Sequence, residues 1–211
     1  TEFATDSFSY YPVWEISTNF DQTNLLSAKS ADNYWTTTNN EESWGNWRRY
    51  DFNQPLGNWN VSSVQNFTGM FRNALKFDQD ISTWNTGSAT NMTSMFENCY
   101  SYNQPVNTWD VADVTSMQEM FEGTMKFNQP VGNWNVGSVT NFTYMFAKAQ
   151  AFNQSDINAW TLKQSGAIDM EGMFDMNPTF NQKLNEWETA YVTSFKNMFR
   201  GDEYKLDGNH Y

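Results

Sequence analysis

The amino-acid sequence predicts a repeat solenoid of six stacked tandem copies, and three recurring features indicate it. Each copy opens with an aromatic residue followed by Asn or Asp and then Gln, at spacings of 25, 25, 25, 25 and 28 residues: Phe52, Phe77, Tyr102, Phe127, Phe152 and Phe180. Seven residues later, or eight in the fifth copy, comes a Trp: Trp59, Trp84, Trp109, Trp134, Trp160 and Trp187. Each copy then carries a Met-Phe pair, at residues 70–71, 95–96, 120–121, 145–146, 173–174 and 198–199.

The repeat divides the chain into three parts. Residues 1–51 do not follow it, apart from Gly45-Asn46-Trp47, and their aromatic residues predict an N-terminal cap or assembly segment. Residues 52–200 are the solenoid, and residues 201–211 are a C-terminal tail. Nothing in the tail resembles a covering coil, so we expect the last coil to be open. The extra residues of the fifth copy, around 155–156 and 162–166, are expected to bulge as a loop.

Each coil is expected to hold one short strand and one short helical segment. Residues 56–61 are apolar-rich and lie between Pro or Gly and Ser, which is typical of a brief strand. Apolar residues then recur at intervals of three or four over residues 64–77, which predicts an α-helical or 3₁₀ segment with one buried face. Ser62 or Ser63 is positioned to cap it.

The recurring side chains are predicted to form ladders through the core, since a copy this small cannot bury them alone. The Trp column is interpreted as one such structural ladder. The Gln column is expected to hydrogen-bond the backbone at a corner of the coil, because an amide offers both a donor and an acceptor. Cys99 aligns with Ala74 and Ala149 and is interpreted as a small core residue.

Composition excludes several classes of function. The net charge is −12, from 24 acidic and 12 basic residues, which argues against nucleic acid and anionic membrane surfaces as partners. No apolar stretch reaches the roughly 20 residues of a membrane-spanning helix. With one Cys and one His, the chain lacks the residues for a disulfide framework, a His-dependent triad or a His-rich metal site. We therefore expect no catalytic residue, no cofactor and no metal site.

Five sequons are candidates for N-glycosylation: Asn66, Asn91, Asn141, Asn60 and Asn153. Asn66, Asn91 and Asn141 share one column beside a buried column, and they are expected to point outward. Duplication of the repeat explains this alignment equally well. Occupied sequons would require a eukaryotic secretory pathway.

The residue pattern allows two other kinds of surface site. The Trp column could stack on sugar rings, although a Trp recurring within an apolar pattern is more often buried. Acidic residues such as Asp78, Asp80, Asp110 and Asp113 could bind Ca²⁺ or act as glycosidase carboxylates. They do not recur at a ligand spacing in every copy, which favours a solvated acidic surface.

The segment Phe-Asn-Gln-Pro-Leu-Gly-Asn-Trp-Asn-Val-Ser-Ser-Val with Phe-Thr-Gly-Met-Phe, residues 52–71, and its five counterparts resemble the 25-residue repeats of BspA-like leucine-rich-repeat surface proteins. The resemblance covers residues 52–200. It implies a right-handed, leucine-rich-repeat-like solenoid on a cell surface that mediates adhesion or recognition. It offers no catalytic residues to transfer.

The sequence thus predicts a non-enzymatic extracellular or cell-surface module with a structural or adhesive role. It would act as a surface glycoprotein or as a self-assembling filament subunit. The partners we expect are copies of itself joined head to tail, other surface proteins or glycans. The alternative is a lectin-like carbohydrate-binding module.

Overall fold

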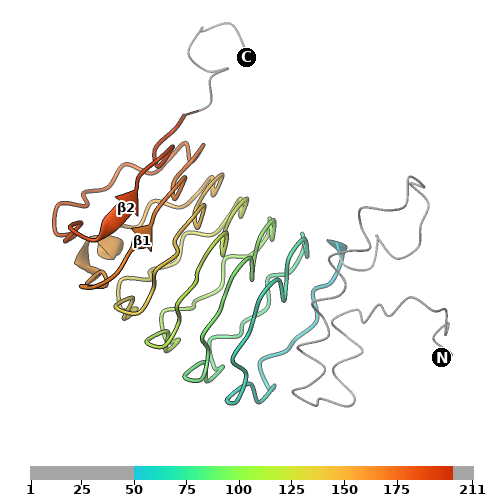
Figure 1. Cartoon of the computed structure of the whole chain (residues 1–211). Helices are drawn as coiled ribbons and strands as arrows, with labels where there is room; N and C mark the ends of the chain where they lie inside the picture. The colour runs from blue at the N-terminus through green and yellow to red at the C-terminus, as the bar shows by residue number, and fades with distance from the viewer. Residues whose placement is uncertain (1–49, 202–211) are drawn as a thin grey trace, which may run out of the picture.

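The computed structural model describes residues 50–201, and Figure 1 shows successive copies as coils of chain standing side by side in one row. Isolated parallel bridges join equivalent positions of neighbouring copies, Asn66 to Asn91, Asn91 to Ser116, Ser116 to Asn141 and Asn141 to Asp169. The predicted cap and tail lie outside the described residues, apart from residues 50–51 and 201.

Regular elements are few within residues 51–201, and there they occur in the last two copies. The 3₁₀ helix η3 spans Ser155–Ala159, the strand β1 spans Ile168–Asp169 and the strand β2 spans Val192–Ser194. The two strands pair in parallel, with an irregular register between Ile168 and Asp169 (Figure 1). The loop expected around 155–156 is therefore one turn of 3₁₀ helix, which buries Ile157, while residues 163–167 remain largely exposed.

The segment 66–73 and its counterparts make most of the backbone contacts between copies. The N–H groups of residues 67, 69, 71 and 73 donate to the carbonyl oxygens of residues 91, 93, 95 and 97 in the next copy, at 2.8–2.9 Å. Between them, the N–H groups of residues 70, 72 and 74 donate to the carbonyl three residues earlier. The chain therefore turns on itself and pairs with its neighbour at every second residue.

This pairing replaces the helix predicted over 64–77, and that prediction is wrong. Gly69 and Asn73 have φ of 63° and 61°, a left-handed conformation that an α-helix cannot contain. The same two columns have positive φ in later copies, at Ser94, Asn98, Glu119, Gly123, Tyr144, Lys148, Gly172, Met176 and Asn197. The interval of three or four still marks the buried residues, because each short turn returns one side chain to the core.

The strand predicted over 56–61 is also absent, and Ser62 caps no helix. Trp59 N–H donates to the Leu56 carbonyl and Val64 N–H to the Val61 carbonyl, so this stretch is a pair of turns. Side chains make the contacts between copies here. In five successive pairs the Trp Nε1–H donates, at 2.8–3.2 Å, to a carbonyl of the preceding copy: Leu56, Ile81, Val106, Val131 and Ile157.

Two aromatic columns fill the core. The column that opens with Phe52 has ring centroids 5.8–6.2 Å apart from copy to copy. The column of Phe71 has spacings of 5.4–5.8 Å. Each ring of the Phe71 column also lies 3.8–4.1 Å from the ring that opens the following copy. These offset parallel stacks bury large apolar surfaces and fix the spacing between copies.

A polar ladder runs beside the first aromatic column. The Oδ1 of Asn53 accepts from the N–H of Asp78 at 3.0 Å and from Gln79 Nε2 at 2.8 Å. The same pair of bonds recurs in the next four copies, with Asp78, Asn103, Asn128 and Asn153 as acceptors. The Gln side chains therefore bind mainly a side-chain oxygen, and only Gln129 and Gln154 also reach a backbone carbonyl.

Tyr102 occupies a position at which every other copy has Phe, and its buried hydroxyl has no hydrogen-bond partner. Burial raises the pKa of this hydroxyl, so it stays protonated. We expect Tyr102→Phe to raise the free energy of unfolding by about 1 kcal/mol, because it removes an unsatisfied buried polar group. Phe127→Tyr in the same column should lower it by about 1–3 kcal/mol. Denaturant titration measures both, and a loss of stability in Tyr102→Phe would contradict this account.

Candidate functional site

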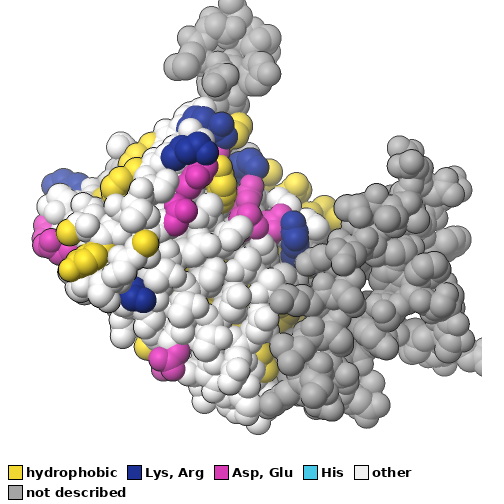
Figure 2. Space-filling model, viewed as in Figure 1, with side chains coloured by type: hydrophobic (Ala, Val, Ile, Leu, Met, Phe, Trp, Pro, Cys, Tyr) yellow, Lys and Arg dark blue, Asp and Glu magenta, His cyan; other side chains and the backbone are white. Residues whose placement is uncertain are grey.

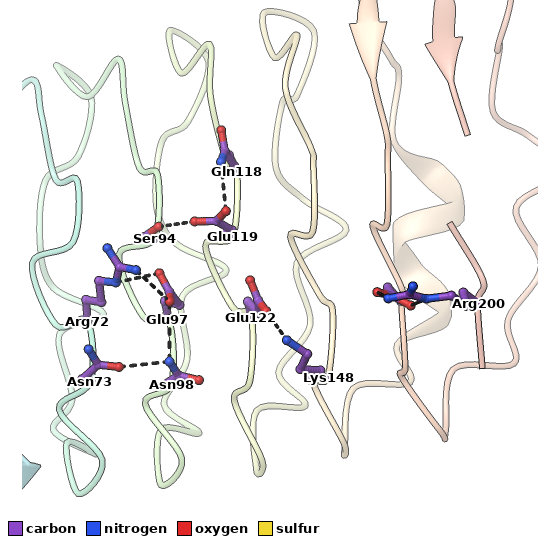
Figure 3. Close-up of polar contacts among 11 residues, drawn as sticks. Arg72, Asn73, Ser94, Glu97, Asn98, Gln118, Glu119, Glu122, Lys148 and Arg200 are labelled. Atoms are coloured by element: carbon purple, nitrogen blue, oxygen red, sulfur yellow. Dashed lines mark hydrogen bonds and ion pairs between the residues drawn. The ribbon is translucent and has the colours of Figure 1, made fainter. Parts of the chain in front are cut away.

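A band of charged side chains crosses the copies on one face. It comprises residues 68–73 of the first copy and the equivalent residues of the later copies. Figure 2 shows adjacent blue and magenta side chains on a surface that is otherwise mostly uncharged. The band contains Arg72 paired with Glu97, Glu122 with Lys148, Glu171 with Lys196 and Asp175 with Arg200. Each pair joins neighbouring copies, and Figure 3 shows Arg72 with Glu97 and Glu122 with Lys148. The sequence analysis did not identify this band, although charges of opposite sign about 25 residues apart could have indicated it.

Hydrogen bonding and burial hold the acidic side chains of the band in place. Arg72 forms a bidentate ion pair with Glu97, with Nε–Oε2 at 2.8 Å and Nη2–Oε1 at 3.1 Å. Arg200 forms the same bidentate pair with Asp175, with Nε–Oδ1 at 2.8 Å and Nη2–Oδ2 at 2.6 Å. Glu119 accepts from Ser94 Oγ at 2.8 Å and from Gln118 Nε2 at 2.9 Å (Figure 3). These carboxylates already have hydrogen-bond or ion-pair partners, so the band links neighbouring copies. It also presents charge at the surface.

The carboxyl groups do not combine into a metal centre in the part of the chain that the structure describes. No group of three or more His, Cys, Asp or Glu side chains in residues 50–201 is placed to hold a metal ion. Asp78 belongs to the polar ladder, and Asp80 accepts from the N–H of Ser82 at 2.9 Å. Asp110 likewise accepts from the N–H of Ala112.

The predicted Trp ladder lies inside the molecule from the second copy onward. Trp84, Trp109, Trp134, Trp160 and Trp187 are buried, and Trp59 is partly buried and stacks on Trp84 at 6.5 Å. From Trp84 onward, each indole N–H donates a hydrogen bond to a backbone carbonyl of the preceding copy. A sugar ring cannot reach the faces of Trp84, Trp109, Trp134 and Trp160, whereas Trp187 also lines a groove on the last copy. Cys99 is buried too, and its thiol lies 2.8 Å from the Phe71 carbonyl oxygen.

The sequon asparagines of the shared column are partly buried, and each forms a local turn. The Oδ1 atoms of Asn66, Asn91 and Asn141 accept from the N–H two residues ahead at 2.9–3.0 Å. Asp169 makes the same bond in its copy, and Ser116 makes a longer one of 3.5 Å. The column therefore requires an oxygen acceptor rather than an amide nitrogen. Outside it, Asn60 is exposed and binds Ser62, and Asn153 belongs to the polar ladder.

An apolar groove lies on the outer side of the last copy. It is lined by Leu184, Trp187, Thr189, Phe195, Met198 and Phe199. Phe199 is 61% exposed and Phe195 47% exposed, whereas equivalent phenylalanines in earlier copies are buried. We call this surface the C-terminal end face. The sequence analysis did not predict this groove.

The family model described as "Mycoplasma protein of unknown function, DUF285" matches residues 14–124 and again residues 104–209. The chain belongs to this family. The first match begins at residue 14, inside the segment that the sequence analysis separated as a cap. Searches of curated proteins and of solved structures gave no match. Within the described range no helix has the length and apolarity that a membrane crossing needs.

The turn made by the asparagine column can be tested at Asn91. Asn91→Ala removes the oxygen acceptor and should lower the free energy of unfolding by about 1 kcal/mol. Asn91→Asp retains the acceptor, as Asp169 does naturally, and should remain within about 0.5 kcal/mol of the wild type. Urea titration of both variants distinguishes them. Equal losses in the two would show that the turn depends on the amide group.

Glu97 should make stability depend on pH. Its side chain is 11% exposed, and burial raises the pKa of its carboxyl group, with Glu119 and Glu122 acting in the same direction and Arg72 opposing them. The folded state therefore binds the proton more tightly than the unfolded state does. Its contribution to the free energy of unfolding should fall as pH rises from the ordinary pKa of 4.5 through the raised value.

Glu97→Gln removes this titration, so the stability difference between wild type and variant should decrease across that pH window and then become constant. Denaturant titration at a series of pH values measures it. Glu188→Gln, at an exposed position, is the control. A difference that rises with pH would show that the ion pair with Arg72 outweighs burial.

Proposed function

We propose that this chain is a non-enzymatic extracellular module with a structural or adhesive role, built as a leucine-rich-repeat-like solenoid of the BspA-like kind. The parallel bridges between equivalent residues and the pairing of each described copy with its neighbour support the solenoid. Membership of a family described from Mycoplasma whose matches overlap along the chain supports its repeat character. The cell-surface location follows from the resemblance of the repeats.

The observation that carries this proposal is that recurring and variable positions have different structural roles. Recurring side chains hold the copies together: they form the aromatic columns, the Trp hydrogen bonds and the polar ladder. Positions in the charged band change from copy to copy, and one of its columns reads Arg72, Glu97, Glu122, Ala147, Asp175 and Arg200. Glu97, Ala147 and Asp175 of this column are buried, whereas Arg72, Glu122 and Arg200 reach the surface. A constant scaffold whose surface positions change from copy to copy is suited to presenting a surface to a partner.

A lectin-like function has less support. Its main platform would be the Trp column, whose members from the second copy onward are buried with their N–H groups bonded to backbone. A glycan array probed with the full chain tests this alternative directly. Saturable binding to one class of glycan would favour it over a structural or adhesive role.

The role as a glycoprotein stays a prediction, and intact-mass measurement tests it. The native chain would be measured before and after glycosidase treatment. A mass decrease would establish glycans, and substitution of Asn60, the exposed sequon residue, would show whether it carries one.

Surface location can be tested on intact cells of the source organism. A membrane-impermeant amine reagent should label Lys126 and Lys183, which are exposed. Peptide mass spectrometry reads out the labelling, with an abundant cytosolic protein as the control for leakage. Labelling that appears only after lysis would overturn the extracellular assignment. Turnover of a glycoside that is lost on substitution of one carboxylate would overturn the non-enzymatic assignment.

A further inference from the structure

A row of large apolar side chains lies at the surface beside the charged band. Two residues before the aromatic residue that opens the following copy, the first three copies carry Leu75, Tyr100 and Met125. Tyr100 is 39% exposed and Met125 36% exposed, and Leu75 is partly buried. The fourth copy has Gln150 at this position. We call Leu75, Tyr100 and Met125 the apolar stripe, and Figure 2 shows hydrophobic side chains along the edge next to the charged band.

In each ion pair of the charged band, the basic side chain is more exposed than its acidic partner. The side chain of Lys148 is 53% exposed and that of Glu122 18%, while Arg72 is 36% and Glu97 11% exposed. The same order holds in the other two pairs, Lys196–Glu171 and Arg200–Asp175. The carboxylates therefore lie beneath the cations, and the band presents positive charge to solvent although the net charge of the chain is −12.

Two further cations flank the stripe on its other side. Lys76 and Lys126 directly follow the first and last residues of the stripe, and both are exposed. Lys76 forms an ion pair with Asp51, whereas Lys126 has no ion-pair partner within residues 50–201. Along the chain of each copy, the stripe position therefore lies between the positions of Arg72 and Lys148 and those of the two lysines.

An apolar centre within a charged rim is the usual composition of a protein–protein interface, where Tyr, Met and Arg are enriched. A rim of exposed cations favours acidic residues in the partner. A uniformly charged polyanion fits less well, because its binding depends on cations that are not already neutralised. All but one of the flanking cations have a carboxylate partner within the chain. The charges therefore select the partner, and contact with the stripe must supply most of the affinity.

We propose that the apolar stripe and its flanking cations bind an acidic segment of another protein that also carries aromatic or aliphatic side chains. This inference rests on the adhesive role proposed above and specifies the partner for it. Apolar side chains of the segment cover Tyr100 and Met125, and its carboxylates pair with Lys126 and Lys148. Because the stripe runs across three copies that stand in one row (Figure 1), an extended segment laid along the row contacts all of it.

Fluorescence anisotropy with the full chain tests the proposal. The probe is a labelled random copolymer of glutamate and tyrosine, and polyglutamate of the same length is the probe that carries charge alone. The wild type should bind the copolymer saturably and at least about tenfold more tightly than polyglutamate, because only the copolymer can cover the stripe. Equal affinity for the two probes would show that the stripe is not part of the binding surface.

Substitutions locate the binding surface. Tyr100→Glu should weaken copolymer binding at least about tenfold, because it removes an apolar contact and adds a like charge. Lys126→Glu should weaken it by about threefold or more, because it reverses a rim charge. Tyr191→Glu, at a position 40% exposed, and Lys183→Glu, also exposed, are the matched controls outside the stripe and the band, and they should bind as the wild type does. Circular dichroism melting verifies folding, and Met125→Glu replaces Tyr100→Glu if the latter does not fold.

Absence of saturable binding to the copolymer, or binding that is unchanged in Tyr100→Glu and Lys126→Glu, would overturn the proposal. Polygalacturonate, an acidic polysaccharide, is the third probe. If it bound more tightly than the copolymer and lost affinity in Tyr100→Glu, the protein partner would be refuted in favour of the lectin-like alternative. Amine labelling of intact cells is independent of these results. A chain that is labelled on cells but does not bind the copolymer would refute this inference alone, whereas a chain labelled only after lysis would refute the proposed extracellular function.

Discussion

The directional pairing of backbone between copies is the constraint on which the rest of the structure depends. N–H groups at every second residue of the 66–73 segment and its counterparts point to the following copy. A neighbour must then lie in parallel and in register, because a shift by one residue would place carbonyls where donors are needed. This register aligns the aromatic columns, and the polar ladder and the Trp bonds repeat with it. The same constraint leaves the last coil chemically different from the first.

The pairing has a local cost that the ladders offset. Two columns hold left-handed backbone, and several of their residues, such as Glu119, Tyr144 and Lys148, are not glycine. A left-handed conformation at such a residue costs about 1–2 kcal/mol. One coil alone would not sustain it. Between neighbours, each conformation is held by four backbone bonds and by stacked rings at 5.4–6.2 Å, so the stack stabilises what the individual residues disfavour.

This explains what the sequence could and could not predict. The period and the buried columns followed from residue identity, because Phe, Trp and Met recur where the core needs them. The helix over 64–77 did not form, since the intervals that indicated it also describe a chain of short turns. Among the residues with positive φ, Gly69, Asn73, Asn98, Gly123, Gly172 and Asn197 are of types that adopt this conformation readily. Ser94, Glu119 and Met176 gave no such signal, because their conformation depends on the neighbouring copy. The charged band varies between copies, so a search for recurring residues passed over it.

The asparagine column and the end face show how the same repeat separates scaffold from surface. The oxygens of Asn66, Asn91 and Asn141 close a turn, a role that Asp169 also fills, so their recurrence has an explanation in backbone structure. Function in a stacked repeat is then expected where the periodicity is interrupted. The part of the chain that the structure describes holds no copy that continues the donor row and the stacked rings past Phe195 and Phe199. The contacts that build the interior of this protein therefore also determine which positions are left to form its surface.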